Sequence, residues 1–280
     1  MQDDVPSPTA LKVAALRALH QTAEVPPVFA DPLAARILGS SAPDLLAAAR
    51  RVAGETQRLR ATLAVRAVVA EEVIAEAAAR GVRQCVILGA GLETFACRNR
   101  DPSLRVFEVD HPATQSWKRG LLRETEIAVP ASVRFVAVNL ERDDLVAALA
   151  DSDLDFAQPV VFAMLGVVFY LARDAVVAPL RRLAAACARG TEIVFDYTEP
   201  LDRAEPEARA AYEAAAVRVA AGGEPWVSFF EPAELQATLR DLGFARVDDI
   251  DAAALNARFC AGRTDGLAVA SLLHLVRART

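Results

Sequence analysis

The sequence contains little of what several large classes of protein require. Only Lys12 and Lys118 are lysines among the 31 basic residues of this 280-residue chain, and the formal net charge is −6. A nucleic-acid-binding surface needs an excess of basic side chains on one face, so the acidic balance argues against one. No uncharged apolar run reaches the roughly 18 residues that a membrane span needs. We therefore expect neither a nucleic acid nor a membrane as a partner.

Cysteine is sparse and scattered. The four cysteines, Cys85, Cys97, Cys187 and Cys260, show no CxxC spacing. Zinc sites and disulfide frameworks depend on such spacings, so we expect no metal and interpret the cysteines as small apolar side chains in a reducing compartment. The first ten residues, MQDDVPSPTA, lack the basic start and apolar stretch of a secretory signal. The expected location is the cytoplasm.

Short apolar runs alternate with helical patterns after residue 80. This alternation predicts βαβ units and a doubly wound, mostly parallel sheet whose strands are covered on both faces. The expected strands are QCVIL (84–88), LRVFEVD (104–110), VRFVAVN (133–139), PVVFAML (159–165), TEIVFDY (191–197) and a closing strand within LAVASLLHLVRAR (267–279). The expected fold class is therefore α/β.

The expected organisation is one domain over residues 1–280. Residues 1–80 are alanine-rich and without strand-like runs, which predicts an N-terminal helical cap, with one helix starting at Asp31-Pro32. Residues 81–280 form the core, interrupted by a polar helical insertion at about 198–224. The stretch PAELQATLRDLGF predicts a further helix that ends at Gly243.

Two glycines stand directly after the first expected strand, in GAGLET. In a doubly wound fold this turn faces the ligand, and Gly89 and Gly91 let the backbone approach it without a Cβ. A dinucleotide site usually has a third Gly or Ala where this chain has Thr94. Thr94 therefore favours a ligand without a diphosphate, such as S-adenosylmethionine. The simpler alternative is an ordinary tight turn.

Two carboxylates end the second expected strand. Glu108 and Asp110 follow Gly89 at the sequence separation that is typical of a ribose-binding carboxylate. Such a carboxylate can accept hydrogen bonds from both hydroxyls of the ribose. NAD and S-adenosylmethionine share that ribose, so these residues do not distinguish the two cofactors. A nicotinamide-dependent oxidoreductase stays open as an alternative.

Five segments carry a family resemblance, and FEVDHPATQ is the most specific string within them. They are RGVRQCVILGAGLETFACR, LRVFEVDHPATQSWKR, FVAVNLERDDL, MLGVVFYL and IVFDY. From about Thr9 onward the chain resembles the leucine carboxyl methyltransferase family, in its bacterial branch of small-molecule methyltransferases. The resemblance implies a class I methyltransferase fold with a seven-stranded sheet and S-adenosylmethionine as the cofactor. It also implies a cytoplasmic enzyme of secondary metabolism that methylates an oxygen atom of a small-molecule acceptor.

The resemblance also implies where the cofactor contacts lie. The positions expected around the methionine end and the sulfonium are Gly89, Ala90, Gly91, Leu165 and Gly166. The positions expected around the ribose and the adenine are Asp110, with Glu108 behind it, and Asn139, Leu140 and Glu141. Arg66 is expected to hold the carboxylate of the donor. Lys12 is a weaker candidate for that role and is equally well explained as a solvated helix lysine.

Four positions depart from the family pattern. Asn139 stands where members often have Asp, and its amide oxygen can still accept a hydrogen bond from the adenine amine. Val68 replaces a second arginine, and Glu93 replaces a shorter aspartate. Leu165 replaces an acidic residue of eukaryotic members, which argues against a protein C-terminus as the acceptor. A donor-binding cyclase or regulatory module of the same fold, and a structural protein with a decayed site, therefore stay open.

The expected chemistry needs alignment and desolvation of the two reactants. A carboxylate acceptor needs no base, whereas a phenol generally does. His20, in the cap, is the one candidate base and is alternatively structural, while His111 is expected at the ribose edge and His274 in the core. Tyr170 is the other candidate catalytic residue. We therefore expect a small apolar acceptor that carries a carboxylate or an acidic phenol.

The acceptor pocket is expected between the cap, the end of the fifth strand and one aromatic stretch. The expected wall residues are Phe195, Asp196, Tyr197 and the stretch PWVSFF (225–230), although Trp226, Phe229 and Phe230 are alternatively a core patch. Arg258 is a candidate for binding an acidic acceptor, or an ordinary surface arginine. No pattern indicates the oligomeric state.

Overall fold

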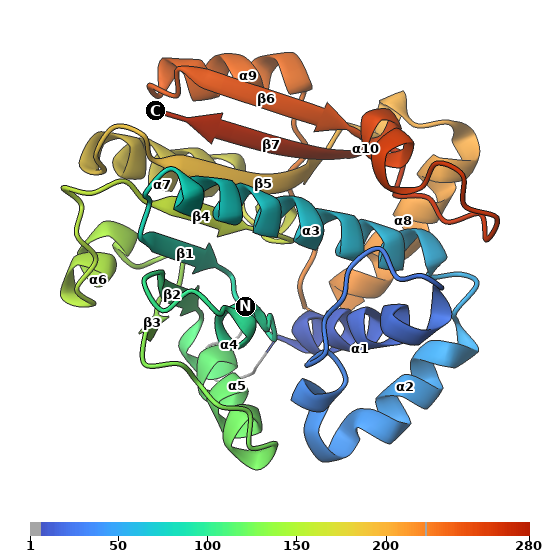
Figure 1. Cartoon of the computed structure of the whole chain (residues 1–280). Helices are drawn as coiled ribbons and strands as arrows, with labels where there is room; N and C mark the ends of the chain where they lie inside the picture. Colours follow the sequence, from blue (N-terminus) through green and yellow to red (C-terminus); the bar gives the residue numbers. More distant parts are fainter. Residues whose placement is uncertain (1–6, 222) are drawn as a thin grey trace.

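A seven-stranded sheet forms the centre of the molecule in a computed structural model that describes residues 7–221 and 223–280 (Figure 1). The strand order is β3-β2-β1-β4-β5-β7-β6, with β7 antiparallel to both of its neighbours and the other pairs parallel. The strands are β1 (Gln84–Leu88), β2 (Arg105–Asp110), β3 (Val133–Ala137), β4 (Val161–Met164), β5 (Glu192–Thr198), β6 (Arg246–Asp251) and β7 (Leu273–Arg279). This arrangement confirms the expected α/β fold.

The central strands are mostly apolar because both of their faces are covered. Every residue of β1 is buried, and its side chains alternate between two apolar clusters. Val86, opposite Phe107 on β2 and Phe162 on β4, belongs to one cluster. Cys85 and Ile87 belong to the other. The sheet therefore divides the core into two layers.

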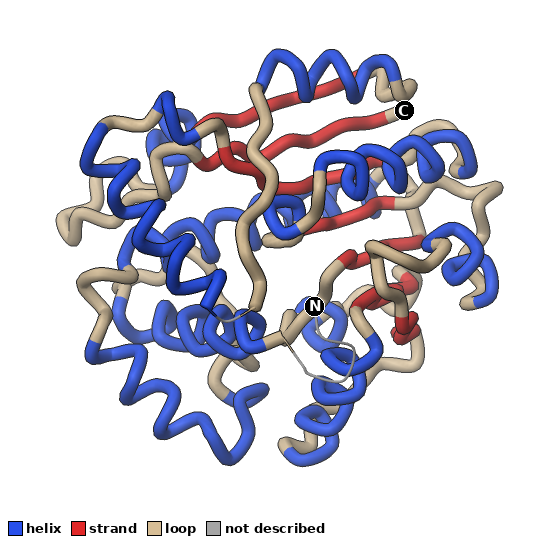
Figure 2. Tube along the Cα trace, turned by 180° about the vertical axis from the view of Figure 1, so that it is seen from behind, coloured by secondary structure: helices blue, strands red, loops and turns tan. Residues whose placement is uncertain are grey.

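Helices cover both faces of the sheet, as Figures 1 and 2 show from opposite sides. One cluster contains residues of α6 (Leu145–Asp151), α7 (Arg173–Ala186) and α9 (Pro232–Asp241). The opposite cluster contains residues of α3 (Gln57–Ala79), α4 (Phe95–Arg98) and α10 (Ala252–Phe259). The helix α5 (Pro112–Glu124) follows β2, and the expected helix end at Gly243 lies directly beyond α9. No helix within the described residues combines the length and the apolar character that a membrane span requires.

The cap is smaller than the sequence predicts. It consists of α1 (Pro8–Ala23), η1 (Arg36–Ser41) and α2 (Ala42–Arg51), whereas α3 lies across the sheet in Figure 1. Val65, Val69 and Ile74 of α3 pack in the same cluster as the strands. No α-helix begins at Asp31-Pro32, where the chain instead forms a turn that leads into η1.

The helical insertion matches the sequence prediction, whereas the edge strand β6 does not. The expected insertion corresponds to η3 (Leu201–Arg203) and α8 (Pro206–Ala221). In contrast, β6 was not expected, because its sequence RVDDID is charged and only partly buried at the edge of the sheet. A strand that pairs with one neighbour needs no continuous apolar run, so hydrophobicity does not reveal it.

His274 on β7 lies between two carboxylates at this antiparallel edge. Its Nδ1 is 2.8 Å from Asp249 Oδ1, and its Nε2 is 2.5 Å from Glu199 Oε1. The Tyr197 hydroxyl donates to the other oxygen of Asp249 at 2.6 Å. Burial lowers the pKa of His274, but hydrogen bonds and charge from the two carboxylates outweigh burial and raise it above its usual range.

We expect this histidine to make stability depend on pH. A raised pKa in the folded state means that the native protein binds the proton more tightly than the unfolded chain does. The contribution is therefore complete below the unfolded-state pKa, about 6.5, and is lost as pH rises through the folded-state pKa. Urea unfolding between about pH 6 and pH 9 should show a falling free energy of unfolding. His274→Gln should lack this slope, and an unchanged slope in that variant would contradict the assignment.

Candidate functional site

A cavity of about 550 Å³ lies at the carboxyl ends of β1, β2 and β4. Here β1 has β2 on one side and β4 on the other, so the order of the strands reverses direction at this point of the sheet. In doubly wound folds this switch point is where ligands bind. Residues of α1, α3, η2 (Val168–Tyr170) and the segment after α8 complete the wall.

The loop after β1 forms the floor of the cavity. Gly89 and Gly91 both have positive φ, at 69° and 46°, and the Gly89 N–H donates to the Val109 carbonyl at 2.9 Å. A Cβ on Gly89 would lie 2.3 Å from Val167 Cγ2. Glycine is therefore required at this position by backbone conformation and by space. Ala90 also lines the cavity, so the structure brings the three expected loop residues together.

Asp110 lies at the end of β2 and faces the cavity. Its carboxylate accepts hydrogen bonds from the Gly91 N–H and, at 2.7 Å, from the His111 N–H. Burial nevertheless raises the pKa of this carboxyl. Each oxygen of a carboxylate can accept more than one hydrogen bond, so Asp110 retains capacity for the hydroxyls of a ribose.

Glu108 does not line the cavity, contrary to the expectation that it supports the ribose site. Its side chain is buried beneath α5, and Lys118 Nζ lies 2.7 Å from Oε2. Burial raises the pKa of Glu108, although the charge of Lys118 acts in the opposite direction. This residue therefore forms a buried ion pair below the site.

Arg66 reaches the cavity from α3. Its Nη1 lies 3.0 Å from Asp196 Oδ2, and the other oxygen of Asp196 accepts the Gly166 N–H at 2.6 Å. A Cβ on Gly166 would lie 2.6 Å from Arg66 Nη2. The guanidinium therefore lies against the backbone that follows β4, and Asp196 holds both of them. Leu165, which precedes Gly166, also lines the cavity.

The expected adenine residues line the cavity beyond β3. Asn139, Leu140 and Glu141 all contribute to the wall. The Asn139 side-chain oxygen accepts the Glu141 N–H at 3.0 Å, while the Asn139 N–H donates to Asp143 at 2.8 Å. This residue thus shapes its own loop as an Asx turn. Its hydrogen bond to an adenine amine stays a prediction.

The position of the missing third glycine is filled by a hydrogen-bonded side chain. The Thr94 hydroxyl donates to Asp31 Oδ2 at 2.7 Å and accepts from Arg98 Nε at 2.9 Å. The preceding residue, Glu93, accepts the N–H groups of Thr94 and Phe95 at 2.6 and 2.9 Å. These N–H groups begin the four-residue helix α4, where a dinucleotide fold would hold its diphosphate. The carboxylate of Glu93 therefore takes the place that the diphosphate has in a dinucleotide fold.

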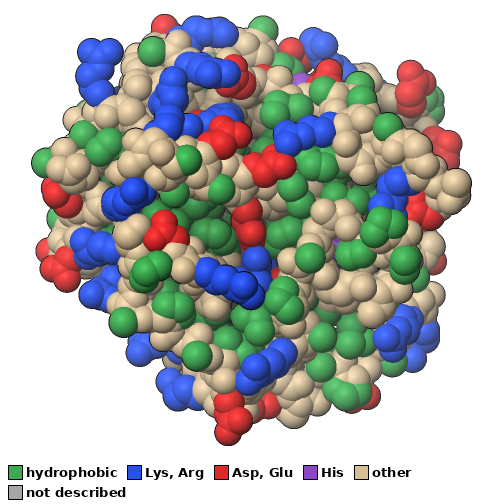
Figure 3. All heavy atoms as spheres, in the orientation of Figure 1, with side chains coloured by type: hydrophobic (Ala, Val, Ile, Leu, Met, Phe, Trp, Pro, Cys, Tyr) green, Lys and Arg blue, Asp and Glu red, His purple; other side chains and the backbone are tan. Residues whose placement is uncertain are grey.

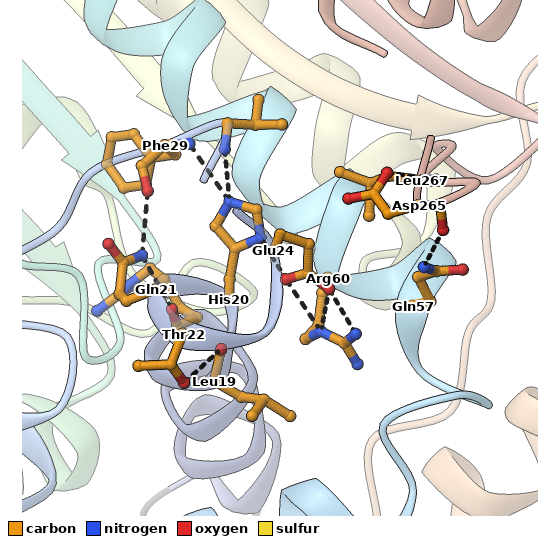
Figure 4. Close-up of polar contacts among 12 residues, drawn as sticks. Leu19, His20, Gln21, Thr22, Glu24, Phe29, Gln57, Arg60, Asp265 and Leu267 are labelled. Carbon is orange, nitrogen blue, oxygen red and sulfur yellow. Dashed lines mark hydrogen bonds and ion pairs between the residues drawn. The ribbon is translucent and has the colours of Figure 1, made fainter. Parts of the chain in front are cut away.

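His20 lies in the cap, as Figure 4 shows, and is not among the residues that line the cavity. It is fully buried, with Nδ1 2.9 Å from Glu24 Oε2 and Nε2 accepting the N–H groups of Val28 and Phe29 at 3.0 and 3.3 Å. Both ring nitrogens are occupied by contacts within the cap. This placement excludes His20 as a base for an acceptor in the cavity and favours its structural alternative.

Tyr170 and His111 line the cavity, whereas Lys12 is exposed on α1. Burial raises the pKa of the Tyr170 hydroxyl. His111 is the N-cap of α5. The structure therefore favours the solvated alternative for Lys12.

Most of the other expected wall residues lie elsewhere. Phe195, Asp196 and Tyr197 are buried within β5, and Arg258 pairs with Glu72 at 2.8 Å on the surface. Pro225 and Val227 line the cavity, whereas Trp226, Phe229 and Phe230 do not. Phe230 lies in the core and Trp226 packs against Phe169 and Tyr212, which favours the core-patch alternative.

Several lining residues carry no motif that sequence reasoning could use. These polar residues are Thr9, Arg17, Glu71 and Glu224. The one available signal is in α1, where Arg17 stands within an apolar run that is buried throughout. Within the described residues, no three His, Cys, Asp or Glu side chains gather as metal ligands. On the face shown in Figure 3, acidic and basic side chains are interspersed.

Comparison with known proteins gives one consistent result. Residues 10–184 match the model of the leucine carboxyl methyltransferase family. YktD of Bacillus subtilis, named as an S-adenosyl-L-methionine-dependent methyltransferase, is 30% identical over 223 residues, which cover 79% of this chain and 73% of YktD. A similarly named protein of Frankia alni, FRAAL3718, is 36% identical over 193 residues, which cover 66% of each chain.

Solved structures show the same fold. A protein from Thermobifida fusca named as a methyltransferase has a TM-score of 0.60 at 18% identity, covering 100% of this chain and 96% of its own. A DUF574 family protein from Streptomyces avermitilis has a TM-score of 0.57 at 19% identity, covering 85% of this chain and 91% of its own. The seven-stranded sheet with an N-terminal helical part is therefore an established architecture.

A methyl group added at Gly166 should disturb the site, whereas one added at Gly120 should not. Gly166 has φ 71°, and its added Cβ would displace the Arg66 guanidinium. Gly166→Ala should cost about 1–2 kcal/mol in the free energy of unfolding. It should also weaken S-adenosylhomocysteine binding, measured by calorimetry, by about tenfold.

Gly120→Ala is the matched control. Gly120 lies within α5 with nothing within 4 Å of an added Cβ, so this variant should gain up to about 1 kcal/mol from helix propensity. Its ligand affinity should stay unchanged. Equal affinity losses in the two variants would show that Gly166 has no special relation to the site.

Proposed function

The chain belongs to the leucine carboxyl methyltransferase family and is an S-adenosylmethionine-dependent methyltransferase, and we propose that it methylates an oxygen atom of a small apolar molecule. The proposed acceptor group is a carboxylate or an acidic phenol. The observation that supports this proposal most directly is the cavity itself. It combines residues suited to bind the methyl donor with a largely apolar wall. We further propose a cytoplasmic location, which the four free cysteines support.

The side chains of the cavity fit the groups of the donor. The carboxylate of Asp110 can accept hydrogen bonds from ribose hydroxyls, and the guanidinium of Arg66, which lines the cavity, can bind a carboxylate. Gly89 and Gly91 leave the loop backbone close to the cavity. When bound, the donor supplies a methyl carbon that its positive sulfur makes reactive toward oxygen. The protein contributes alignment of the acceptor and exclusion of water.

The acceptor side of the cavity is mainly apolar. Its side chains include Val13, Leu63, Ala67, Leu171 and Pro225. An apolar wall favours the flat or aliphatic body of a small molecule, because its burial removes apolar surface from water. A neutral alcohol in such a site needs a base, and His20 is not placed to act as one. An acceptor that ionises readily on its own avoids this requirement.

Tyr170 lies where it can position the acceptor. Thr9, Arg66 and Glu224 line the same cavity as Tyr170, and burial raises the pKa of the Tyr170 hydroxyl, so it stays protonated at neutral pH. A protonated phenol donates a hydrogen bond and does not remove protons. We therefore assign Tyr170 to orienting the acceptor oxygen.

The proposed function is tested by turnover against a panel of small carboxylates and phenols. Release of S-adenosylhomocysteine together with a methyl ester or methyl ether is the expected result. With a carboxylate acceptor the rate should be constant above about pH 6, whereas with a phenol it should rise toward the pKa of that phenol. Binding of S-adenosylhomocysteine without turnover of any acceptor would favour the cyclase or regulatory alternative. Methylation of nitrogen alone would contradict O-methylation.

Tyr170→Phe should separate orientation from acid–base chemistry. The loss of one hydrogen bond to an ionised oxygen should lower kcat/KM for the acceptor by about tenfold. The KM for the donor and the shape of the pH profile should stay the same. A lost limb in the pH profile would instead identify Tyr170 as a group that transfers a proton.

A further inference from the structure

Arg17 connects the cap to the loop that forms the floor of the cavity. It lies in the middle of α1 and is only 6% exposed. Its Nη2 donates to the Leu92 carbonyl oxygen at 2.6 Å, in the loop that begins with Gly89. Its Nη1 lies 3.3 Å from Glu93 Oε2, and its Nε lies 2.9 Å from Asp31 Oδ2. The two terminal nitrogens therefore hold consecutive loop residues, while Nε lies within ion-pair distance of Asp31.

Asp31 forms a second connection between the same two parts of the molecule. Besides Arg17, it accepts the Thr94 hydroxyl at 2.7 Å and lies 3.3 Å from Arg98 Nε. Arg98 in turn pairs with Glu71 of α3, which lines the cavity. The side chain of Asp31 is fully buried. The loop is thus held from the cap side at three consecutive residues, 92, 93 and 94.

These contacts determine the electrostatic state of the loop. Burial alone would raise the pKa of the Glu93 carboxyl, but the charges of Arg17 and Arg98 outweigh it and lower that pKa to about 2. An ionised Glu93 is what holds the N–H groups of Thr94 and Phe95. Without Arg17, Asp31 and Glu93 would lose a shared cation in a buried setting, which is unfavourable unless they move or take up protons.

We propose that Arg17 is a positioning residue for the methyl donor, which acts by fixing the loop of residues 89–94 against the cap. This rests on the proposed function, in which that loop faces the donor. Because the same side chain joins cap and loop, docking of the cap and binding of the donor are coupled. The proposed role is one of position, because the contacts of Arg17 with Leu92, Glu93 and Asp31 hold the loop against the cap.

The test compares two buried arginines of similar environment. Arg60 is 3% exposed and binds Glu24 Oε1 at 2.5 Å and the Ala53 carbonyl at 2.6 Å, but it does not touch the loop or the cavity. Arg17→Met and Arg60→Met should both lower the melting temperature. Only Arg17→Met should weaken S-adenosylhomocysteine binding by about tenfold or more, with Arg60→Met within about threefold of the parent protein.

Calorimetry with S-adenosylhomocysteine, below both melting temperatures, is the deciding measurement because it needs no acceptor. In turnover assays, Arg17→Met should raise the KM for the donor and change kcat much less. Equal affinity losses in both variants, or none in Arg17→Met, would overturn the proposal. If the parent protein fails to bind S-adenosylhomocysteine, the proposed function fails with it, so the two failures are distinguishable.

A milder variant keeps the test decisive if Arg17→Met does not fold. Thr94→Val preserves the size of the side chain and removes the hydroxyl that joins Asp31 to Arg98. We expect it to fold and to weaken ligand binding by about threefold to tenfold. Arg17→Lys keeps the charge but cannot hold three partners, so it should recover only part of the affinity. An unchanged affinity in Thr94→Val would also overturn the proposal.

Discussion

Charge pairing between the cap and the sheet is the interaction on which the rest of this structure depends. Asp31, Glu71 and Glu93 are held by two guanidinium groups, those of Arg17 and Arg98. These side chains come from four separate parts of the chain, so moving any one part breaks at least one of these ion pairs. An unpaired buried charge is strongly unfavourable. The network therefore fixes the cap, α3 and the loop after β1 in one arrangement.

The opposite wall of the cavity follows the same principle with a different pair. Arg66 of α3 and Asp196 of β5 meet behind Gly166, and the carboxylate also binds the Gly166 N–H. This second pair ties α3 to the far side of the switch point. The cavity thus lies between two sets of buried ion pairs, and α3 contributes to both. That explains why α3 belongs to the core even though its sequence continues the alanine-rich pattern of the cap.

The parts of the fold and site that depend on backbone geometry could be predicted from the sequence. Buried parallel strands need apolar runs, and a tight approach to a ligand needs glycine, so the five parallel strands, Gly89, Gly91 and Asp110 were all indicated. Features that depend on distant partners could not be predicted. Nothing in the sequence shows that Lys118 pairs with Glu108, or that Arg17 binds the carbonyl of Leu92 in the loop after β1. The edge strand β6 was missed for the related reason that pairing with one neighbour leaves little hydrophobic signal.

The absence of a third glycine now has a physical explanation that bears on cofactor choice. In a dinucleotide fold, the helix after the first strand offers free N–H groups to a diphosphate. In this chain the carboxylate of Glu93 binds those groups, and Thr94 is held by Asp31. A diphosphate would meet an ionised carboxylate at that point and would have to displace it against the pull of Arg17. A nucleoside without phosphates needs only the ribose carboxylate and the glycine backbone, which remain accessible in the cavity. Glu93 therefore places a negative charge where dinucleotide folds offer free N–H groups to a diphosphate.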